Sequence, residues 1–244
     1  MSEPTLQQAS GPVPCVGITG ASGSLGRELL RAWHRRGARL IAFTSTTEPL
    51  ELADAQGQPI PLRQASWQVG AEAELAPWLA ELDVLVINHG VNVRGRRDAA
   101  ATGLSLEVNA LSGWRLLELF AEQSAGRDPQ RPPAEVWVNT SEAEIEPAFS
   151  PLYEISKRLM GQLLSLRALD LSRRVRIRRL VLGPFRSALN PVGLMGAGFV
   201  ADQILLQARL GLNLIIVTPN PLVYVLMPLA TLSRWLYGSL LSHD

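Results

Sequence analysis

Short apolar runs alternate with segments of helical spacing from residue 13 onward. The runs predict seven strands, over residues 13–19, 39–44, 62–69, 82–88, 136–140, 175–182 and 214–217. Helical spacing of apolar residues predicts helices over residues 27–36, 74–81, 104–122 and 151–171. Such alternation is typical of a parallel sheet with helices on both faces. We therefore predict a three-layer Rossmann-type α/β fold, with a doubly wound parallel sheet of about seven strands.

Two of the predicted strands differ in polarity. Residues 82–88 contain the unbroken sequence Val-Leu-Val-Ile, which suits a strand buried on both faces. In residues 175–182, Arg176, Arg178 and Arg179 are interleaved with apolar residues. That pattern is expected of a strand near a partly exposed end of the sheet.

The 244-residue chain is long enough to bury one large core, and we predict a single domain over residues 13–244. Residues 1–12 are polar and lack the apolar region of a signal peptide, so we expect a flexible N-terminal tail. The regular alternation ends after residue 184. Apart from the last predicted strand, we expect the remaining residues to form helices over the mouth of the site.

The stretch 214–232 has no charged residue and is long enough to raise the question of a membrane span. It contains Pro219, Pro221 and Pro228, each of which removes a backbone donor and disrupts a helix. A buried strand followed by an apolar helix is the better interpretation. A peripheral contact of this C-terminal segment with a membrane or a partner stays open as an alternative.

Charge and cysteine content exclude some classes of protein. The 23 Lys and Arg residues nearly balance the 22 Asp and Glu residues, which does not favour nucleic-acid binding. Cys15 is the only cysteine, so no disulfide forms within the chain and no cysteine-based zinc cluster exists. No His, Asp and Glu residues have the spacing of metal ligands, and we predict no metal site. A reducing, cytoplasmic location is expected.

A glycine-rich segment lies between the first predicted strand and the first predicted helix. Glycines permit a tight turn and a close approach of the backbone to a pyrophosphate, while the N-terminus of the helix offers free N–H groups. A turn that only connects two elements is the alternative. Because a strand and a helix flank the segment, we favour a dinucleotide site. Its predicted contacts are Gly20, Ser22, Gly23, Ser24, Leu25 and Gly26.

The end of the second predicted strand bears on cofactor choice. Residues 44–47 read Thr-Ser-Thr-Thr, where an acidic residue would bind the ribose of NAD. Hydroxyls can donate to the extra phosphate of NADP, and the first acid, Glu48, comes late. This favours NADP(H), with Thr44 and Ser45 as contacts, over NAD(H). The alternative is that these residues only form a turn and a helix cap.

Tyr153 and Lys157 are four residues apart on a predicted helix, so the phenol and the ammonium share one face. Ser141 precedes Tyr153 by 12 residues, at the end of a predicted strand. Together with the glycine turn, Asn88-His89-Gly90 and Asn109, these residues occur in the order of the short-chain dehydrogenase/reductase family. The chain resembles that family from its first predicted strand to its sixth and the loop that follows.

The resemblance implies roles for four residues. Tyr153 would be the general acid/base, and its pKa, ordinarily near 10, would be lowered by the positive charge of Lys157 and of an oxidised nicotinamide. Lys157 would also bind the nicotinamide ribose. Ser141 would hold and polarise the substrate oxygen. Asn109 would support a water chain that delivers protons.

The resemblance also implies further cofactor contacts. Gln68 stands where the family usually has an Asp that reaches the adenine, so the Gln68 amide and the backbone of Val69 would take over that role. His89 departs from the family pattern, and we expect a neutral, packed side chain there rather than a catalytic one. The remaining predicted contacts are Asn88, Gly90, Gly183, Pro184, Phe185 and Ser187.

Some residues attract attention without a predicted role in catalysis. Glu142, Glu144 and Glu146 alternate in the segment between Ser141 and Tyr153, and we interpret them as solvated loop residues. In the family, the segment after Ser187 contributes a substrate lid, which here would span residues 188–244. Its apolar residues either line the cleft, and then favour a hydrophobic substrate, or pack on the sheet. They are Leu194, Met195, Phe199, Val200, Ile204, Leu205 and Leu206.

The resemblance therefore predicts an NAD(P)-dependent oxidoreductase that interconverts an alcohol and a carbonyl by hydride transfer, on a small hydrophobic substrate. Family members commonly form dimers or tetramers, so a homodimer or homotetramer is expected. Two alternatives stay open. One is an NADP(H)-binding sensor or scaffold without turnover. The other is the reductase component of a membrane-associated lipid-modifying system.

Overall fold

The fold is built on one sheet of seven parallel strands. The computed structural model describes residues 13–128, 130–171 and 175–241. The strand order is β3-β2-β1-β4-β5-β6-β7, and every neighbouring pair is parallel. The bounds are β1 Cys15–Thr19, β2 Arg39–Thr44, β3 Arg63–Ser66, β4 Val84–Ile87, β5 Ala134–Ser141, β6 Val175–Leu182 and β7 Leu214–Val217. The predicted Rossmann-type sheet of about seven strands is confirmed.

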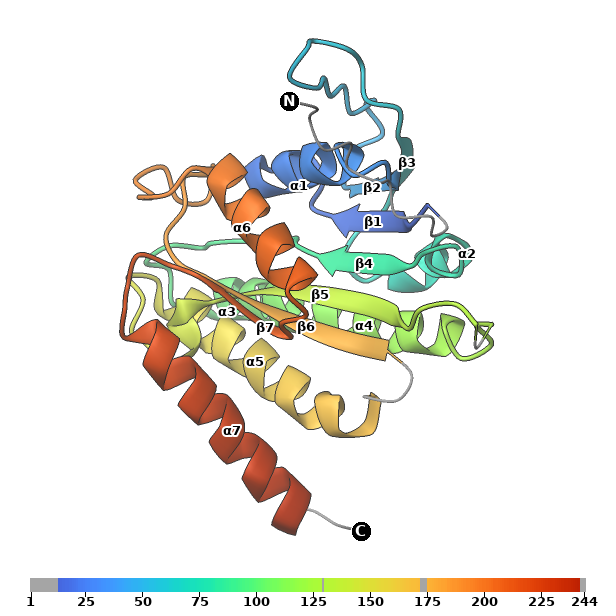
Figure 1. The fold of residues 1–244 in the computed structure, drawn as a ribbon. Helices are drawn as coiled ribbons and strands as arrows, with labels where there is room; N and C mark the ends of the chain where they lie inside the picture. The colour runs from blue at the N-terminus through green and yellow to red at the C-terminus, as the bar shows by residue number, and fades with distance from the viewer. Residues whose placement is uncertain (1–12, 129, 172–174, 242–244) are drawn as a thin grey trace, which may run out of the picture.

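Helices cover both faces of the sheet (Figure 1). One face packs against α1 (Ser24–His34) and α6 (Ala197–Arg209) through a core that includes Ile18, Leu29 and Ile204. The other face packs against α4 (Ser112–Gln123) and α5 (Pro151–Leu171). Successive residues of a strand point to opposite faces, and every residue of β1 and β4 is buried because helices cover both faces.

The site lies at the carboxyl edge of this sheet. β1 pairs with β2 on one side and with β4 on the other, so the chain changes its winding direction there. Ligands of doubly wound sheets bind in the crevice outside the carboxyl ends of the strands at such a switch point. The glycine turn follows β1, and Ser141 is the last residue of β5. The topology therefore brings both predicted motifs to one edge.

Two predicted helices are interrupted. Residues 104–122 do not form one helix: α3 (Ala99–Leu106) continues into a single π-helical stretch, Glu107–Leu111, before α4. Residues 74–81 form a short 3-10 turn, Glu72–Leu75, and one turn of helix, α2 (Ala76–Leu79). Another 3-10 turn, Glu142–Glu144, follows β5. π-Helical insertions are frequent at functional sites.

The expectation of a partly exposed sheet end at β6 is wrong. β6 lies between β5 and β7, and both Arg178 and Arg179 are buried. Arg178 Nε donates to Glu135 Oε2 over 2.7 Å, and Arg179 pairs with Glu144. Buried guanidinium groups are tolerated where a carboxylate compensates for their lost hydration. The two carboxylates, Glu135 and Glu144, are distant in sequence from these arginines, so the sequence pattern did not reveal the pairs.

The two helices after residue 184 pack on opposite sides of the sheet. α6 packs its Val200 and Ile204 into the core beside α1. α7 (Val223–Leu241) runs along α5 and projects beyond the sheet (Figure 1). Only Val223 and Met227 of α7 are fully buried among its described side chains, against β6 and β7. None of the described helices is long and apolar enough to span a membrane.

Candidate active site

Three of the four predicted catalytic residues converge at the carboxyl edge of β5. Ser141 ends β5, while Tyr153 and Lys157 lie one turn apart on α5, which packs against the sheet there. The Lys157 ammonium lies 5.7 Å from the centroid of the Tyr153 ring. Its Nζ donates a hydrogen bond of 2.9 Å to the Asn139 carbonyl oxygen. This bond fixes the lysine against the strand that carries Ser141.

The expected lowering of the Tyr153 pKa by Lys157 is not found in the protein alone. Burial raises the pKa of the Tyr153 phenol, the Ser141 hydroxyl opposes that rise by hydrogen bonding, and the Glu142 carboxylate adds to it. The ammonium is held by the Asn139 carbonyl rather than by the phenol. Burial also lowers the pKa of Lys157 to about 8, against an opposing effect of the Glu144 carboxylate.

Asn109, the fourth predicted residue, lies in the π-helical stretch and uses both ends of its amide. Its Nδ2 donates to the Val91 carbonyl over 2.9 Å and to Ser156 Oγ over 3.0 Å. Its Oδ1 accepts from the Val91 N–H over 2.8 Å. Asn109 therefore ties the loop after β4 to α5, one residue before Lys157.

The glycine turn has the shape that a pyrophosphate requires. Gly20 has φ +60°, and a Cβ there would lie 2.9 Å from His89 Cα. A Cβ on Gly26 would overlap the Gly20 carbonyl oxygen. Gly23 caps α1, and no side chain occupies that helix N-terminus. The first-turn N–H groups are thus free to bind an anion, so the residues present fit a dinucleotide.

His89 is packed and neutral, as predicted from the sequence. Its Nδ1 lies 2.9 Å from Thr19 Oγ1, and its ring meets Trp67 edge-on with centroids 5.2 Å apart. Burial, with a smaller contribution from the Lys157 charge, lowers the His89 pKa to about 4. The side chain is therefore uncharged near neutral pH.

Of the two predicted cofactor contacts after β2, Thr44 is buried and hydrogen-bonded, whereas Ser45 is exposed. Thr44 is buried, and its hydroxyl donates to the Thr46 carbonyl over 2.7 Å. This hydrogen bond within the turn agrees with the alternative in which Thr44 has a structural role. Ser45 is exposed at the carboxyl edge. The predicted adenine residue Gln68 donates from Nε2 to the Ser45 carbonyl over 2.8 Å, and Val69 packs partly on the core.

The remaining predicted cofactor residues lie after β4 and after β6. Asn88 Oδ1 accepts a 3.0 Å bond from Asn139 Nδ2, which links β4 to β5, and Gly90 approaches Asn109. Gly183 and Pro184 continue from β6. Phe185 packs partly against the α1 and α6 core, and Ser187 Oγ accepts from the Asn190 N–H over 3.2 Å.

Solved structures with this architecture include several dehydrogenases. A short-chain dehydrogenase from Burkholderia cenocepacia in complex with NADP has a TM-score of 0.75 at 18% identity, over 94% of this chain and 98% of that one. The bulky-bulky ketone specific alcohol dehydrogenase from Comamonas testosteroni has a TM-score of 0.74 at 16% identity, over 96% and 98%. The fold is that of the short-chain dehydrogenases/reductases.

A further structure with the short-chain dehydrogenase/reductase fold comes from Sphingobium yanoikuyae, in complex with NADPH. Its TM-score is 0.72 at 16% identity, over 94% of this chain and 96% of that one. A curated relative, the monoglucosyldiacylglycerol epimerase of Synechocystis sp., is 46% identical over 213 residues. That match covers 87% of this chain and 51% of the relative, so the chain spans about half the length of that protein. No protein-family model matches the chain.

Within this short-chain dehydrogenase/reductase fold, the interpretation of the acidic segment after Ser141 as solvated is wrong. Glu144 is 3% exposed and pairs with Arg179, so it is a buried anion. Glu142 is half-buried and accepts a hydrogen bond from the Thr218 hydroxyl, and burial raises its pKa. Sequence reasoning missed these partners because they come from β6 and from the loop after β7.

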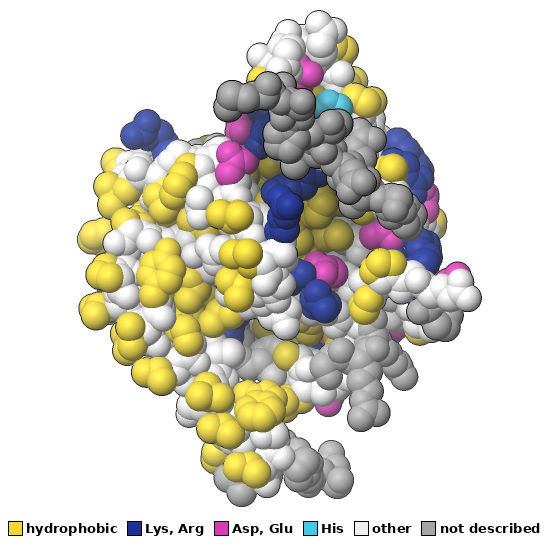
Figure 2. Space-filling view, in the orientation of Figure 1, with side chains coloured by type: hydrophobic (Ala, Val, Ile, Leu, Met, Phe, Trp, Pro, Cys, Tyr) yellow, Lys and Arg dark blue, Asp and Glu magenta, His cyan; other side chains and the backbone are white. Residues whose placement is uncertain are grey.

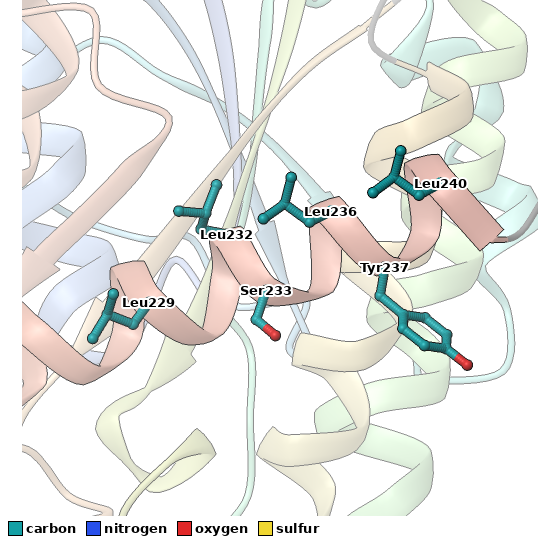
Figure 3. A pocket seen from close by; sticks show the side chains of 6 residues that line it. All are labelled: Leu229, Leu232, Ser233, Leu236, Tyr237 and Leu240. Carbon is teal, nitrogen blue, oxygen red and sulfur yellow. The ribbon is translucent and has the colours of Figure 1, made fainter.

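A shallow apolar cavity of about 480 Å³ lies on α7 (Figure 3), and none of the predicted catalytic residues lines it. Apolar side chains also cover much of the molecular face shown in Figure 2, including α7. Across the described ranges 13–128, 130–171 and 175–241, no group of His, Cys, Asp and Glu could hold a metal ion. The cavity is lined by Leu229, Leu232, Ser233, Leu236, Tyr237 and Leu240.

Proposed function

We propose that the chain is an NADP(H)-dependent enzyme that transfers hydride to or from a carbon bearing a hydroxyl or carbonyl group. The observation that carries this proposal is the convergence of Ser141, Tyr153 and Lys157 at the carboxyl edge of β5. The glycine turn after β1 supports it, since its backbone suits a pyrophosphate. The fold neighbours that hold NADP or NADPH support the choice of cofactor.

The protein's own groups have distinct tasks in this proposal. The turn from Gly20 to Gly26 holds the pyrophosphate, and Lys157 holds the nicotinamide ribose. When bound, the nicotinamide supplies or accepts the hydride. Ser141 orients the substrate oxygen, and Tyr153 gives it a proton in reduction or takes one in oxidation. Asn109 keeps the loop after β4 in place beside Lys157.

Epimerisation of a lipid-linked hexose is a second candidate, because the relative that is 46% identical is named as an epimerase of monoglucosyldiacylglycerol. Ser141, Tyr153 and Lys157 could serve both net oxidation or reduction and epimerisation. Tyr153 would take the hydroxyl proton of a secondary alcohol and bound NADP⁺ would accept the hydride from its carbon, which gives a ketone and NADPH. Return of both, with the hydride reaching the opposite face, gives the epimer with no net oxidation. The substrate would then be polar at its reacting end and apolar elsewhere.

Exposed apolar side chains support a lipid-like substrate or surface. On α7 they include Leu229, Leu232, Trp235 and Leu240, more than is usual for a helix facing water. We propose that this face contacts the apolar part of a bilayer from its surface. A cytoplasmic location and a homodimer or homotetramer remain part of the proposal.

Cofactor titration tests the proposed function first. Protein fluorescence is followed during addition of NADPH and of NADH, and we expect tighter binding of NADPH. NADPH oxidation is then measured with aliphatic, aromatic and steroid-like ketones and aldehydes, with Tyr153→Phe as control. That variant should bind NADPH and lose activity by roughly 10²-fold or more. Binding of neither nucleotide would exclude the proposal, and binding without turnover would favour a sensor.

An epimerase would regenerate its cofactor in every cycle, whereas a dehydrogenase would consume it. The chain is incubated with monoglucosyldiacylglycerol in mixed micelles and a catalytic amount of NADP⁺, and the released hexose is analysed after hydrolysis. An epimeric hexose formed without net NADPH production, and absent with Tyr153→Phe, supports epimerisation. In a parallel incubation with excess NADP⁺, NADPH formed in proportion to the lipid consumed indicates a dehydrogenase.

A further inference from the structure

Four residues of α5 form one stripe that starts at the catalytic tyrosine. Tyr153, Lys157, Gly161 and Ser165 follow one another at intervals of four, so they share a face of the helix. The first two belong to the proposed catalytic group. The third has no side chain, which leaves a space one turn beyond the lysine.

The Glu144 carboxylate occupies the space that Gly161 leaves. A Cβ at Gly161 would overlap both the carboxylate of Glu144 and the guanidinium of Arg179. Glu144 is 3% exposed and Arg179 is 6% exposed. Arg179 Nε donates to Glu144 Oε1 over 2.9 Å, and Arg179 Nη1 donates to Ser165 Oγ over 3.3 Å. The stripe is therefore continued by a buried ion pair.

Charges of alternating sign follow this stripe. The Lys157 ammonium is followed by the Glu144 carboxylate and then by the Arg179 guanidinium of β6. The charges of Arg179, Glu144 and Arg158 also act on the guanidinium of Arg234 on α7, so Arg234 lies near this ion pair. On the other side, Lys157 faces Tyr153 on its own helix and acts on the neutral His89 after β4.

A buried ion pair needs a reason to exist, since desolvation of two charges is expensive and apolar residues often serve stability better. Burial lowers the Lys157 pKa to about 8, close to neutral pH, and among the charged neighbours Glu144 is the one that opposes this effect. We infer that Glu144, held by Arg179 in the space left by Gly161, is a positioning residue that keeps Lys157 charged beneath Tyr153. The inference rests on the proposed function for its link to catalysis.

The sequence offers a direct measurement of this effect. Lys157 is the only lysine among the 23 Lys and Arg residues of the chain. Lysine labelled with ¹³C at Cε therefore gives one lysine signal, whose chemical shift during a pH titration reports the Lys157 pKa without any assay of activity. In Glu144→Gln, we expect the midpoint to move to lower pH by about one unit, because the neighbouring negative charge is lost.

The matched control is a second ion pair that also holds an arginine of β6. Glu135, near the beginning of β5, pairs with Arg178 in the middle of β6 at 2.7 Å, and Glu135 lies about 20 Å from Ser141 along the strand. Glu135→Gln removes a comparable partner, and we expect no movement of the Lys157 midpoint. An equal midpoint in wild type and Glu144→Gln, or an equal movement in Glu135→Gln, would overturn the inference.

A second variant guards against loss of folding in Glu144→Gln, which leaves Arg179 buried without its partner. Glu144→Met combined with Arg179→Met removes both charges, and the midpoint should still move to lower pH because, of the two, Glu144 is the one that acts on the Lys157 ammonium. For catalysis, the alkaline limb of kcat/KM should move in the same direction. An inactive wild type would overturn the proposed function, whereas an unmoved midpoint would overturn this inference.

Discussion

Lys157 Nζ donates its hydrogen bond to the carbonyl oxygen of Asn139, two residues before Ser141 on β5. The bond joins the helix that carries the phenol to the strand that carries the serine. It also leaves the ammonium 5.7 Å from the Tyr153 ring centroid, so the two side chains lie next to each other at the carboxyl edge of the sheet. The Lys157 side chain therefore helps to set the distance between the proposed catalytic residues on α5 and on β5.

Replacement of Lys157 by Met should weaken both cofactor binding and turnover. The variant keeps most of the side-chain volume and removes the ammonium that would bind the nicotinamide ribose and stabilise a phenolate formed when Tyr153 gives up its proton. We expect kcat/KM to fall by roughly 10²-fold or more, with weaker NADPH binding in a fluorescence titration. Unchanged turnover would contradict the role of Lys157. Far-UV circular dichroism checks that the variant is folded.

Gly26→Ala should disrupt the cofactor turn, because the added Cβ overlaps the Gly20 carbonyl oxygen. We expect NADPH affinity to fall about tenfold or more, with destabilisation of about 1–3 kcal/mol from overpacking. Gly103→Ala in α3 is the matched control. Nothing lies within 4 Å of its added Cβ, so this change should stabilise the helix by up to about 1 kcal/mol. Equal NADPH binding by both variants would contradict the prediction.

Asn109→Ala should destabilise the loop after β4. The change leaves the N–H and carbonyl of Val91 without the amide that pairs with both. We expect the free energy of unfolding to fall by about 1–3 kcal/mol in urea titrations, accompanied by a loss of turnover. The control is Asn92→Ala, which removes an exposed contact to the Arg94 N–H and should change stability by less than about 0.5 kcal/mol.

Glu72 should make the protein sensitive to acid. Its carboxylate is buried and accepts bonds from Arg115 Nε over 2.7 Å and Ser112 Oγ over 2.6 Å. These bonds outweigh burial, which acts in the opposite direction, and the Glu72 pKa is lowered to about 2. Because the folded-state pKa lies below the unfolded one, this stabilisation is present above pH 4.5 and is lost as pH falls toward 2.

Urea titrations across that pH range measure the effect. Relative to Glu72→Gln, wild type should lose on the order of 2 kcal/mol more between pH 5 and pH 2. Glu81→Gln, which breaks the exposed pair with Arg63, should change the slope little. Parallel curves for wild type and Glu72→Gln would contradict the prediction.

Local sequence pattern was sufficient for the elements that lie in the core. The predicted bounds of α5, β6 and β7 agree with the structure, since periodicity and apolar runs determine such elements locally. The break at Asn109 was not predicted, because it accompanies a hydrogen bond to Val91 from another part of the chain. The burial of Arg179 and Glu144 was missed for the same reason. Each looks solvated until its partner, 35 residues away, is known.

The exposed apolar side chains of α7 have a practical consequence for purified protein. Burial of apolar area lowers the free energy by about 25 cal/mol per Å² whatever supplies the covering surface. In plain buffer, the available covering surface is another copy of the same helix, so concentrated samples should self-associate through Leu232 and its neighbours. Added detergent should disperse such aggregates. The particle size measured without detergent will therefore include such aggregates and should not be taken as the number of subunits in the native assembly.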